Sequence, residues 1–273
     1  MIVNKNIYFI KLISFMIPLF IFGIANAQDT IVIYFDYNWE RCDKDNAEYY
    51  REYFKNKNKK FEVEDFFIDG KIQMTGTFKK RNWKEKQGQF IYYHNNGQKR
   101  SEGAYIENKK TGIWTNWYEN GNLDSKGEFI NGKRDKTWVW YFKTGQISAK
   151  EKFVAGERIE WEFWDEKGQK VELEDAEYFP QFEGGMEALL AFIGENTRYP
   201  EYARSRGIQG RVIVGFTVTV EGNIEDVKIH NEVHSSLASE ALRVVELLPQ
   251  FTPGKEHNRI VKVSYNLPVN FRL

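Results

Sequence analysis

A repeat of 24 residues runs through the middle of this chain and constrains its fold more than any other feature. Gly97, Gly121 and Gly145 are spaced by 24 residues, and Gly168 follows after 23. The aromatic residues form two columns in the same register: Phe90, Trp114, Trp138 and Trp161 in one, and Tyr93, Trp117, Tyr141 and Trp164 in the other. A fixed period of this size indicates an array of supersecondary units stacked on their neighbours.

Each unit is predicted to be a pair of antiparallel strands. Asn96-Gly97 and Asn120-Gly121 suit two-residue hairpin turns, because both central residues of such turns need a positive φ. Asn131-Gly132 supplies a second turn inside one unit. A single hairpin is marginally stable in water, so the aromatic residues should stack from one unit to the next.

The stacked core is expected to bury the first aromatic column. We predict that Trp114, Trp138 and Trp161 are largely buried there. The alternative is that the aromatic columns form a surface that binds a sugar or a lipid. The sequence favours the core, because stacking is what stabilises a hairpin array.

The N-terminus is typical of a cleavable secretory signal. Lys5 and Lys11 precede an apolar run over 12–24, and Ala25-Asn26-Ala27 matches a small-residue cleavage site. The run is shorter than the roughly 20 apolar residues of a membrane span. We therefore expect residues 1–27 to be a signal peptide, with an uncleaved membrane anchor as the alternative. Cys42 lies well past the cleavage site and is interpreted as a packing residue.

Composition narrows the function classes. The chain has 273 residues, with 39 basic and 39 acidic side chains. This balance argues against a nucleic-acid-binding protein, which usually carries a basic excess. The aromatic content of 16% favours a strand-rich globular protein, and the length allows two domains.

The last hundred residues follow a different pattern. Residues 184–194 form an amphipathic helix with Met186, Leu189, Leu190 and Ile193 on one face, closed by Gly194. A short helix follows Pro200, a hairpin turns at Gly222-Asn223, and a second amphipathic helix begins at Ser235 or Ser236. The stretch from 261 to 273 alternates apolar and polar residues throughout, as a half-buried strand does. Pro268 favours an edge position for that strand.

No catalytic, cofactor-binding or metal-binding motif is present in the sequence. His230 and His234 are four residues apart, but Glu232 is misplaced for a His-Glu-x-x-His zinc helix. A phosphate-binding glycine loop and a Gly-x-Ser-x-Gly elbow are both missing. We therefore predict that the protein is not an enzyme and uses no cofactor and no metal.

Both patterns resemble known families. The Gly-x-Trp-x-x-Trp-Tyr-x-x-Gly strands over 69–170 resemble MORN-like repeats of the YwqK type. "YPEYARSRGIQGRVIVGFTVTVEGNIEDVKI", "LPQFTPGK" and "VSYNLPVNFRL" resemble the C-terminal domain of TonB-type energy transducers, over about 177–273. The expected fold is therefore mostly β plus α+β. An antiparallel repeat sheet, led into by residues 28–68, precedes two or three helices on a three-stranded antiparallel sheet.

The TonB resemblance implies a mechanism. Domains of this family bind a short periplasmic peptide of an outer-membrane receptor, which adds as a strand to an exposed sheet edge through main-chain hydrogen bonds. The corresponding edge here is the last strand, from about 259 to 271, and the family also contacts receptors near Tyr199-Pro200. The resemblance thus implies these partner-binding residues: Tyr199, Pro200, Val261, Val263, Ser264, Tyr265 and Asn266. For Tyr199 and Pro200, a helix start with a packed ring is an equal alternative.

The chain also departs from a full transducer. Its four histidines all lie outside the N-terminal segment, so the Ser-x-x-x-His pattern of the anchoring helix is missing, and six prolines are too few for a proline-rich arm. We therefore keep two hypotheses: a periplasmic transducer-like protein acting on outer-membrane receptors, and a periplasmic scaffold that binds proteins through both parts without transmitting force. The sequence does not determine the oligomeric state, and a homodimer is one option.

Overall fold

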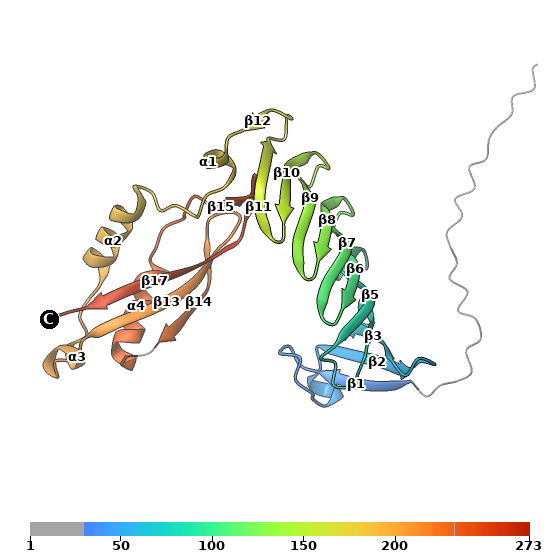
Figure 1. Ribbon diagram of the computed structural model, residues 1–273. Helices are drawn as coiled ribbons and strands as arrows, with labels where there is room; N and C mark the ends of the chain where they lie inside the picture. The colour runs from blue at the N-terminus through green and yellow to red at the C-terminus, as the bar shows by residue number, and fades with distance from the viewer. Residues whose placement is uncertain (1–29, 232) are drawn as a thin grey trace, which may run out of the picture.

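The fold is described for residues 30–231 and 233–273 of a computed structural model. The segment predicted as a signal peptide, residues 1–27, lies outside the described residues. Within the described ranges, no helix is both long and apolar enough to cross a membrane. The chain forms a long curved sheet followed by a smaller α+β unit, and the two meet at an angle (Figure 1).

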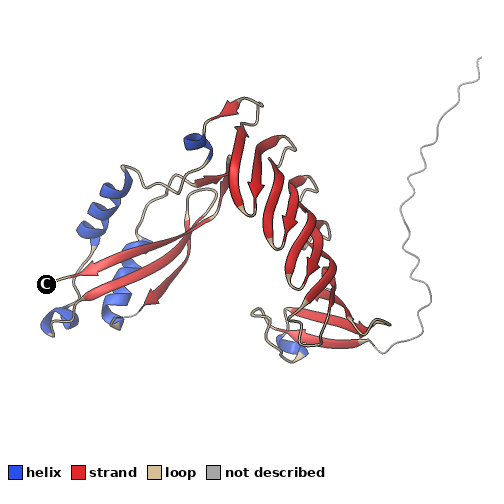
Figure 2. Cartoon of the chain, in the orientation of Figure 1, coloured by secondary structure: helices blue, strands red, loops and turns tan. Residues whose placement is uncertain are grey.

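The sheet is a single antiparallel layer of twelve strands that follow one another in chain order. Its strands, seen as red arrows in Figure 2, are β1 (Ile31–Phe35), β2 (Tyr49–Lys55), β3 (Phe61–Phe67), β4 (Ile72–Phe78), β5 (Lys86–Tyr93), β6 (Lys99–Ile106), β7 (Lys109–Trp117), β8 (Leu123–Ile130), β9 (Lys133–Tyr141), β10 (Ile147–Val154), β11 (Glu157–Trp164) and β12 (Lys170–Val171). The predicted repeat sheet is confirmed, and the lead-in residues from Ile31 belong to it.

The aromatic column packs as a chain of edge-to-face rings. Phe129 lies between Trp114 and Trp138, with ring centroids 6.1 and 5.0 Å from them. Each indole packs over a glycine of the neighbouring strand. A Cβ at Gly103 would lie 2.3 Å from Trp114, and a Cβ at Gly127 would lie 2.1 Å from Trp138, so only glycine leaves room for these rings. Phe90, Trp114 and Trp138 are accordingly at most 2% exposed.

Trp161 is the exception to this column, and the prediction that it is buried is wrong. Its side chain is 44% exposed, whereas Phe163, two residues further along the strand, is buried. The reason is the residue opposite: Trp161 pairs with Glu151, which occupies the position that Gly127 has one unit earlier. A glutamate side chain leaves no room for an indole there, so the ring turns toward solvent.

The turns also differ in type from the prediction. At Gly97, the His94 N–H donates a hydrogen bond to the Gln98 carbonyl, and the Gly97 N–H donates one to the His94 carbonyl. Residues 95–97 therefore form a three-residue loop. Gly97 has a positive φ of 84°, whereas Asn96 does not share this conformation. Asn131 and Gly132 both have positive φ, so the two-residue turn occurs at the other end of the unit.

The C-terminal unit contains a three-stranded antiparallel sheet in the order β14-β13-β17. After the short helix α1 (Leu173–Ala176), its elements are α2 (Gly185–Asn196), α3 (Glu201–Ser205), β13 (Gly210–Val218), β14 (Ile224–Asn231), α4 (Ser235–Glu246), β15 (Gly254–Glu256), β16 (Arg259–Val261) and β17 (Val263–Phe271). The core joins the alternating residues of β13, such as Val212 and Val214, to Leu237 and Val245 of α4 and Leu189 of α2. The predicted α+β architecture is confirmed.

The helices depart from the prediction in detail. Leu189 and Ile193 of α2 are buried, but Met186 and Leu190 are about half exposed, so the apolar face is narrower than the sequence pattern. Gly194 lies inside α2 and does not close it. The N-cap of α4 is His234, whose Nδ1 accepts a hydrogen bond from the Ser236 backbone N–H.

The chain passes from one core to the other within a short segment. Ala176 of α1 belongs to the core of the repeat sheet, whereas Phe182 packs against the core of the C-terminal unit. Between them, Tyr178 forms a β-bridge with Lys255, and Gln181 forms one with Thr252. This connecting segment is therefore tied by one bridge to the β15–β16 hairpin and by another to the residues just before it.

Candidate peptide-binding edge and the junction beside it

Strand β17 forms one edge of the three-stranded sheet. It pairs with β13 over nine consecutive residues, from Val218↔Val263 to Gly210↔Phe271, without a register shift. Among the described residues, no strand pairs with its other side. The prediction that the last strand is an edge strand therefore agrees with this arrangement.

The direction of the free backbone groups follows from a single hydrogen bond. The Ile213 N–H donates to Asn231 Oδ1 on the β14 side of β13, at 2.6 Å. Ile213 pairs with Pro268, so Pro268 is in a non-hydrogen-bonded pair and its backbone groups face away from β13. Because backbone direction alternates along a strand, the N–H groups of Ser264, Asn266 and Asn270 also face the free edge.

The side chains of this edge agree with such an arrangement. Ser264 and Asn266 are exposed, and Tyr265 between them is half-buried. The Tyr265 ring stacks on Phe216 of β13, with centroids 5.3 Å apart and planes 16° apart. Strand β17 is thus held by the packing of Tyr265 on Phe216 and by its pairing with β13. Its outward-facing N–H groups lie along the free edge of the sheet.

Tyr199 and Pro200 lie at the opposite end of β17. The Tyr199 hydroxyl donates to the Ile208 carbonyl at 2.6 Å, and its ring meets Phe271 edge to face, with centroids 5.8 Å apart. Pro200 is the N-cap of α3, with φ −60° and ψ 131°. These contacts give both residues a structural role at the helix start. They do not bring the pair next to Ser264, since Phe271 lies seven residues further along β17 and seven residues of an extended strand span about 23 Å.

Val261 is not on the same strand as the other predicted residues. The predicted strand from 259 breaks at Lys262, and Val261 ends β16, where it pairs with Gly254. The β15–β16 hairpin turns at His257 and Asn258, which have φ of 54° each and are only 5% and 6% exposed. A hairpin tip this deeply buried has a partner, and the partner is the repeat sheet.

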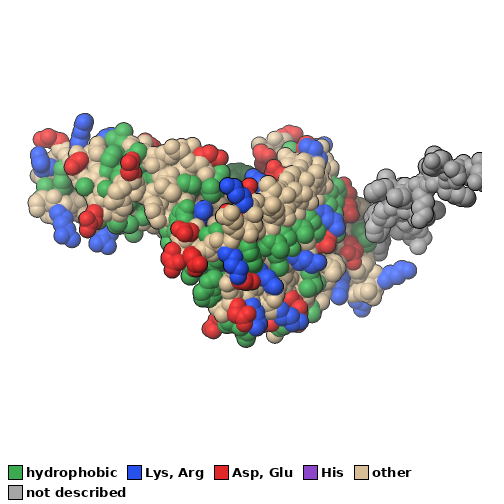
Figure 3. Space-filling view, turned by 90° about the horizontal axis from the view of Figure 1, so that it is seen from above, with side chains coloured by type: hydrophobic (Ala, Val, Ile, Leu, Met, Phe, Trp, Pro, Cys, Tyr) green, Lys and Arg blue, Asp and Glu red, His purple; other side chains and the backbone are tan. Residues whose placement is uncertain are grey.

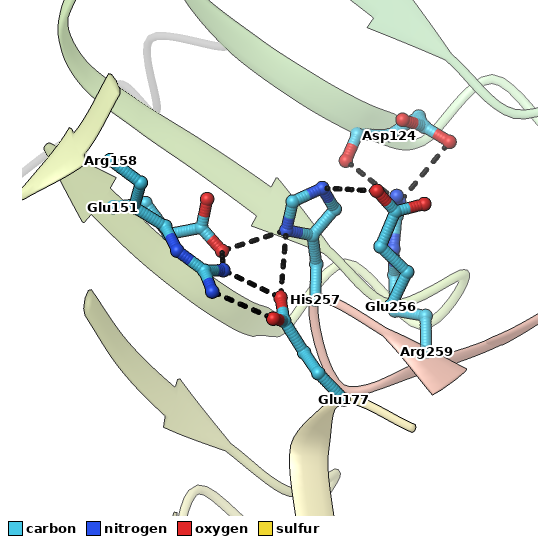
Figure 4. Close-up of polar contacts among 7 residues, drawn as sticks. All are labelled: Asp124, Glu151, Arg158, Glu177, Glu256, His257 and Arg259. Atoms are coloured by element: carbon cyan, nitrogen blue, oxygen red, sulfur yellow. Dashed lines mark hydrogen bonds and ion pairs between the residues drawn. The ribbon is translucent and has the colours of Figure 1, made fainter. Parts of the chain in front are cut away.

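The hairpin tip is inserted against β9, β10 and β11. The His257 imidazole stacks on the Trp140 indole, with centroids 3.9 Å apart. Its Nδ1 lies 2.7 Å from Glu151 Oε1. Glu151 is the residue that interrupts the glycine column, so the break in the repeat and the docking of the hairpin occur at the same place (Figure 4).

Arg158 completes an ion cluster around these residues. Its guanidinium donates to both carboxylate oxygens of Glu177, at 2.7 and 2.8 Å, and to Glu151 at 3.0 Å. Burial works to raise the pKa of Glu177, but Arg158 and His257 outweigh it and the pKa is lowered. The Arg158 pKa is raised, first by the hydrogen bond to Glu177.

The same cluster has the composition of a metal site. Glu151, Glu177 and His257 offer ligand atoms within 4.8 Å of one another. The guanidinium of Arg158, however, already donates to both carboxylates, and a cation in that position competes with a metal for the same oxygens. We interpret the cluster as an ion-pair junction.

Two further contacts extend the junction. Asn258 donates through Nδ2 to the Trp164 carbonyl at 2.7 Å, and Arg259 donates to the Tyr118 hydroxyl at 2.8 Å. Arg259 also lies 3.2 Å from Asp124 Oδ2. Beside these contacts is an open cleft of about 590 Å³ between the repeat sheet and the hairpin, lined on the hairpin side by Ile260 and Val261.

The sequence analysis found the edge strand but missed this junction. One signal was available: the column Gly103, Gly127 continues as Glu151, an acidic residue where the unit requires glycine. The partner of Glu151 could not be inferred, because His257 is 106 positions away.

Comparisons with known proteins agree with both sequence patterns. The family model described as "Gram-negative bacterial TonB protein C-terminal" matches residues 195–273. The model of a MORN repeat variant matches residues 86–107 and 110–131. These two matches fall in the C-terminal unit and in strands β5 to β8 of the repeat sheet.

Curated relatives match in the C-terminal part. Protein TonB of Helicobacter pylori (strain J99) is 30% identical over 80 residues, which is 28% of this chain and 28% of the relative. Protein TonB of Pseudomonas aeruginosa is 36% identical over 63 residues, which is 23% of this chain and 18% of the relative. The chain spans less than a third of the length of these relatives.

A solved structure is also similar, the NMR solution structure of the Helicobacter pylori TonB C-terminal domain (residues 179–285). It is 27% identical, covers 32% of this chain and 79% of its own chain, and has a TM-score of 0.27. On the sequence matches, residues 86–107 and 110–131 are similar to a MORN repeat variant, and residues 195–273 are similar to the TonB C-terminal domain.

Proposed function

We propose that this protein is an exported, periplasmic protein whose TonB-type domain binds an extended peptide of an outer-membrane TonB-dependent receptor at the free edge of β17. The observation that carries the proposal is that the Ser264 and Asn266 N–H groups face the free edge of β17, whose other edge is fully paired with β13. An added strand gains main-chain hydrogen bonds at such an edge with little dependence on side-chain sequence.

The C-terminal similarity supports the class of partner. The relatives that match are TonB proteins, and the matched segment contains β17. Val263, Ser264, Tyr265 and Asn266 are the proposed contact residues. Tyr199 and Pro200 belong to the proposal only if the peptide extends to the C-terminal end of β17, where Tyr199 packs on Phe271.

The test removes one outward amide without touching the pairing with β13. Proline at Ser264 deletes an N–H that faces the free edge, and proline is tolerated at strand edges. Binding of a labelled peptide from a receptor plug to the full chain should weaken about tenfold in Ser264→Pro, the loss expected from one or two hydrogen bonds. Fluorescence anisotropy gives the dissociation constant, and circular dichroism shows whether the variant is folded.

Two control variants separate the backbone from the side chains. Ser264→Ala keeps the amide and should bind like the wild type, and so should Lys262→Ala, which lies outside β17. If a folded Ser264→Pro variant binds the peptide with unchanged affinity, the site lies elsewhere, and the surface around Tyr199 is the next place to test.

A second function is favoured by the junction. The repeat sheet stands where the resemblance implies a proline-rich arm. It is joined to the TonB-type domain by a buried contact between His257 and Glu151. A unit of this kind suits a scaffold that binds proteins through both parts. Mass spectrometry of the mature protein distinguishes the two: a chain starting at Gln28 supports the scaffold, and an intact N-terminus supports an anchored transducer.

A further inference from the structure

A second repeated feature lies on the aromatic face of the repeat sheet. Lys86, Lys110, Arg134 and Arg158 recur at intervals of 24 residues, near the starts of β5, β7, β9 and β11. All four side chains are half-buried. They form one row of positive charges that crosses four units of the sheet.

Each cation of this row lies on aromatic rings. Lys110 Nζ is 4.2 Å from the centroid of Trp114 and 5.1 Å from that of Phe129. The Arg134 guanidinium is 5.2 Å from Trp138 and 5.4 Å from Trp140. The aromatic floor holds the charged groups in place, and Figure 3 shows basic side chains lying among hydrophobic ones over the repeats.

The two central cations differ from the outer ones in their partners. Arg158 is neutralised by Glu151 and Glu177, and Lys86 donates to the Tyr92 hydroxyl. Lys110 and Arg134 take part in none of the ion pairs or side-chain hydrogen bonds among the described residues. Burial and the nearby charge of Arg134 lower the pKa of Lys110, as expected where no carboxylate compensates.

The spacing indicates what could compensate these charges. Equivalent residues two strands apart lie about 9.6 Å apart. A peptide in the polyproline II conformation advances about 9.3 Å in three residues and presents every third side chain on the same face. The rings beneath the row, Trp114 and Trp138, are at most 2% exposed, so they offer no face on which a sugar could stack. A peptide with an acidic residue at every third position therefore fits the row better than an acidic glycan does.

We propose that the row Lys86, Lys110 and Arg134 binds an acidic peptide segment of a partner protein in the polyproline II conformation, running across the strands of the repeat sheet. This site is separate from the edge of β17. Lys110 and Arg134 contribute the main contacts, because their charges are uncompensated, and Lys86 contributes a third contact one unit away.

The experiment uses the full chain and a labelled peptide with glutamate at every third position and serine between. Lys110→Gln combined with Arg134→Gln should weaken its binding by about tenfold or more, as measured by fluorescence anisotropy at low salt. Lys109→Gln combined with Lys133→Gln is the matched control. It removes the same charge from adjacent, exposed positions of the same two strands and should change the affinity less than about twofold.

Three outcomes would overturn the proposal: no binding of the peptide by the wild type, equal losses in the two double variants, or equally tight binding of an acidic oligosaccharide such as oligogalacturonate. Arg134→Lys, which keeps the charge, should retain most of the binding and guards against a loss caused by misfolding. Ser264→Pro should bind the acidic peptide normally, so failure of this proposal is distinguishable from failure at β17.

Discussion

The imidazole of His257 stacks on the indole of Trp140, with ring centroids 3.9 Å apart and planes 20° apart. The two residues come from different parts of the molecule: Trp140 belongs to the repeat sheet and His257 to the tip of the β15–β16 hairpin. Because β17 begins six residues after His257, just past the end of the hairpin, the candidate peptide-binding edge is anchored to the repeat sheet at one end.

The ion cluster at this junction should make the free energy of unfolding depend on pH in the acidic range. The pKa of Glu177 is lowered in the folded protein from its ordinary value of 4.5, so its contribution to stability is present above that value and is lost as the pH falls through the folded-state pKa. Glu177→Gln should cost about 2 kcal/mol at neutral pH, and the difference from wild type should shrink below pH 4.5. Denaturant unfolding of both proteins, from neutral pH to below pH 4.5, measures this difference.

Glu174→Gln provides the control for that experiment. Glu174 is exposed on α1, three positions before Glu177, and its substitution should leave the free energy of unfolding nearly unchanged at every pH. A constant difference between Glu177→Gln and wild type down to pH 3 would contradict the assigned role of Glu177.

The aromatic column predicts unequal effects for two tryptophans of the same repeat position. Trp138→Ala should lower the free energy of unfolding by about 3–5 kcal/mol, because its buried side chain leaves a cavity. Trp161→Ala should cost less than about 1 kcal/mol, since Trp161 is 44% exposed. Thermal melts of both variants decide the matter, and equal melting temperatures would rule out the stacked core.

The glycine beneath each indole gives a second test of the packing. In Gly127→Ala the new Cβ would lie 2.1 Å from Trp138, so the ring or the strand must shift, at a cost of about 1–3 kcal/mol. Gly194→Ala adds a methyl group in open space within α2 and should stabilise the protein by about 0.5–1 kcal/mol. Chemical denaturation of both variants should therefore show shifts of opposite sign.

The C-terminal unit is predicted to fold without the repeats. A fragment from Glu174 to Leu273 retains the core built from β13, β17, α2 and α4. It loses the partners of His257 and Asn258, so we expect a cooperative unfolding transition with a less protected β15–β16 hairpin. Calorimetry and amide hydrogen exchange of the fragment check the two parts of this prediction, and a fragment that unfolds without cooperativity would place the boundary elsewhere.

The repeat sheet and the strands of the C-terminal unit could be predicted from the sequence because their signals are local. The glycine turns and the alternation from Val263 to Phe271 each depend on a few neighbouring residues. The 24-residue period repeats such local patterns along the chain. Backbone conformation and side-chain alternation depend on such neighbours, so strand content, stacking of Trp114 and Trp138, and the edge position suggested by Pro268 were all evident.

Only the tertiary structure decided where those elements meet. Glu151 stands out in the sequence only as a break in the glycine column, and its role depends on His257, which lies 106 positions away. Trp161 follows the repeat pattern, yet it is exposed because Glu151 fills the space of a glycine. The outward direction of the Ser264 amide likewise follows from the pairing of Pro268 with Ile213 and of Ile213 with Asn231. Contacts between distant segments depend on how whole elements pack, and the local pattern of residues does not encode that packing.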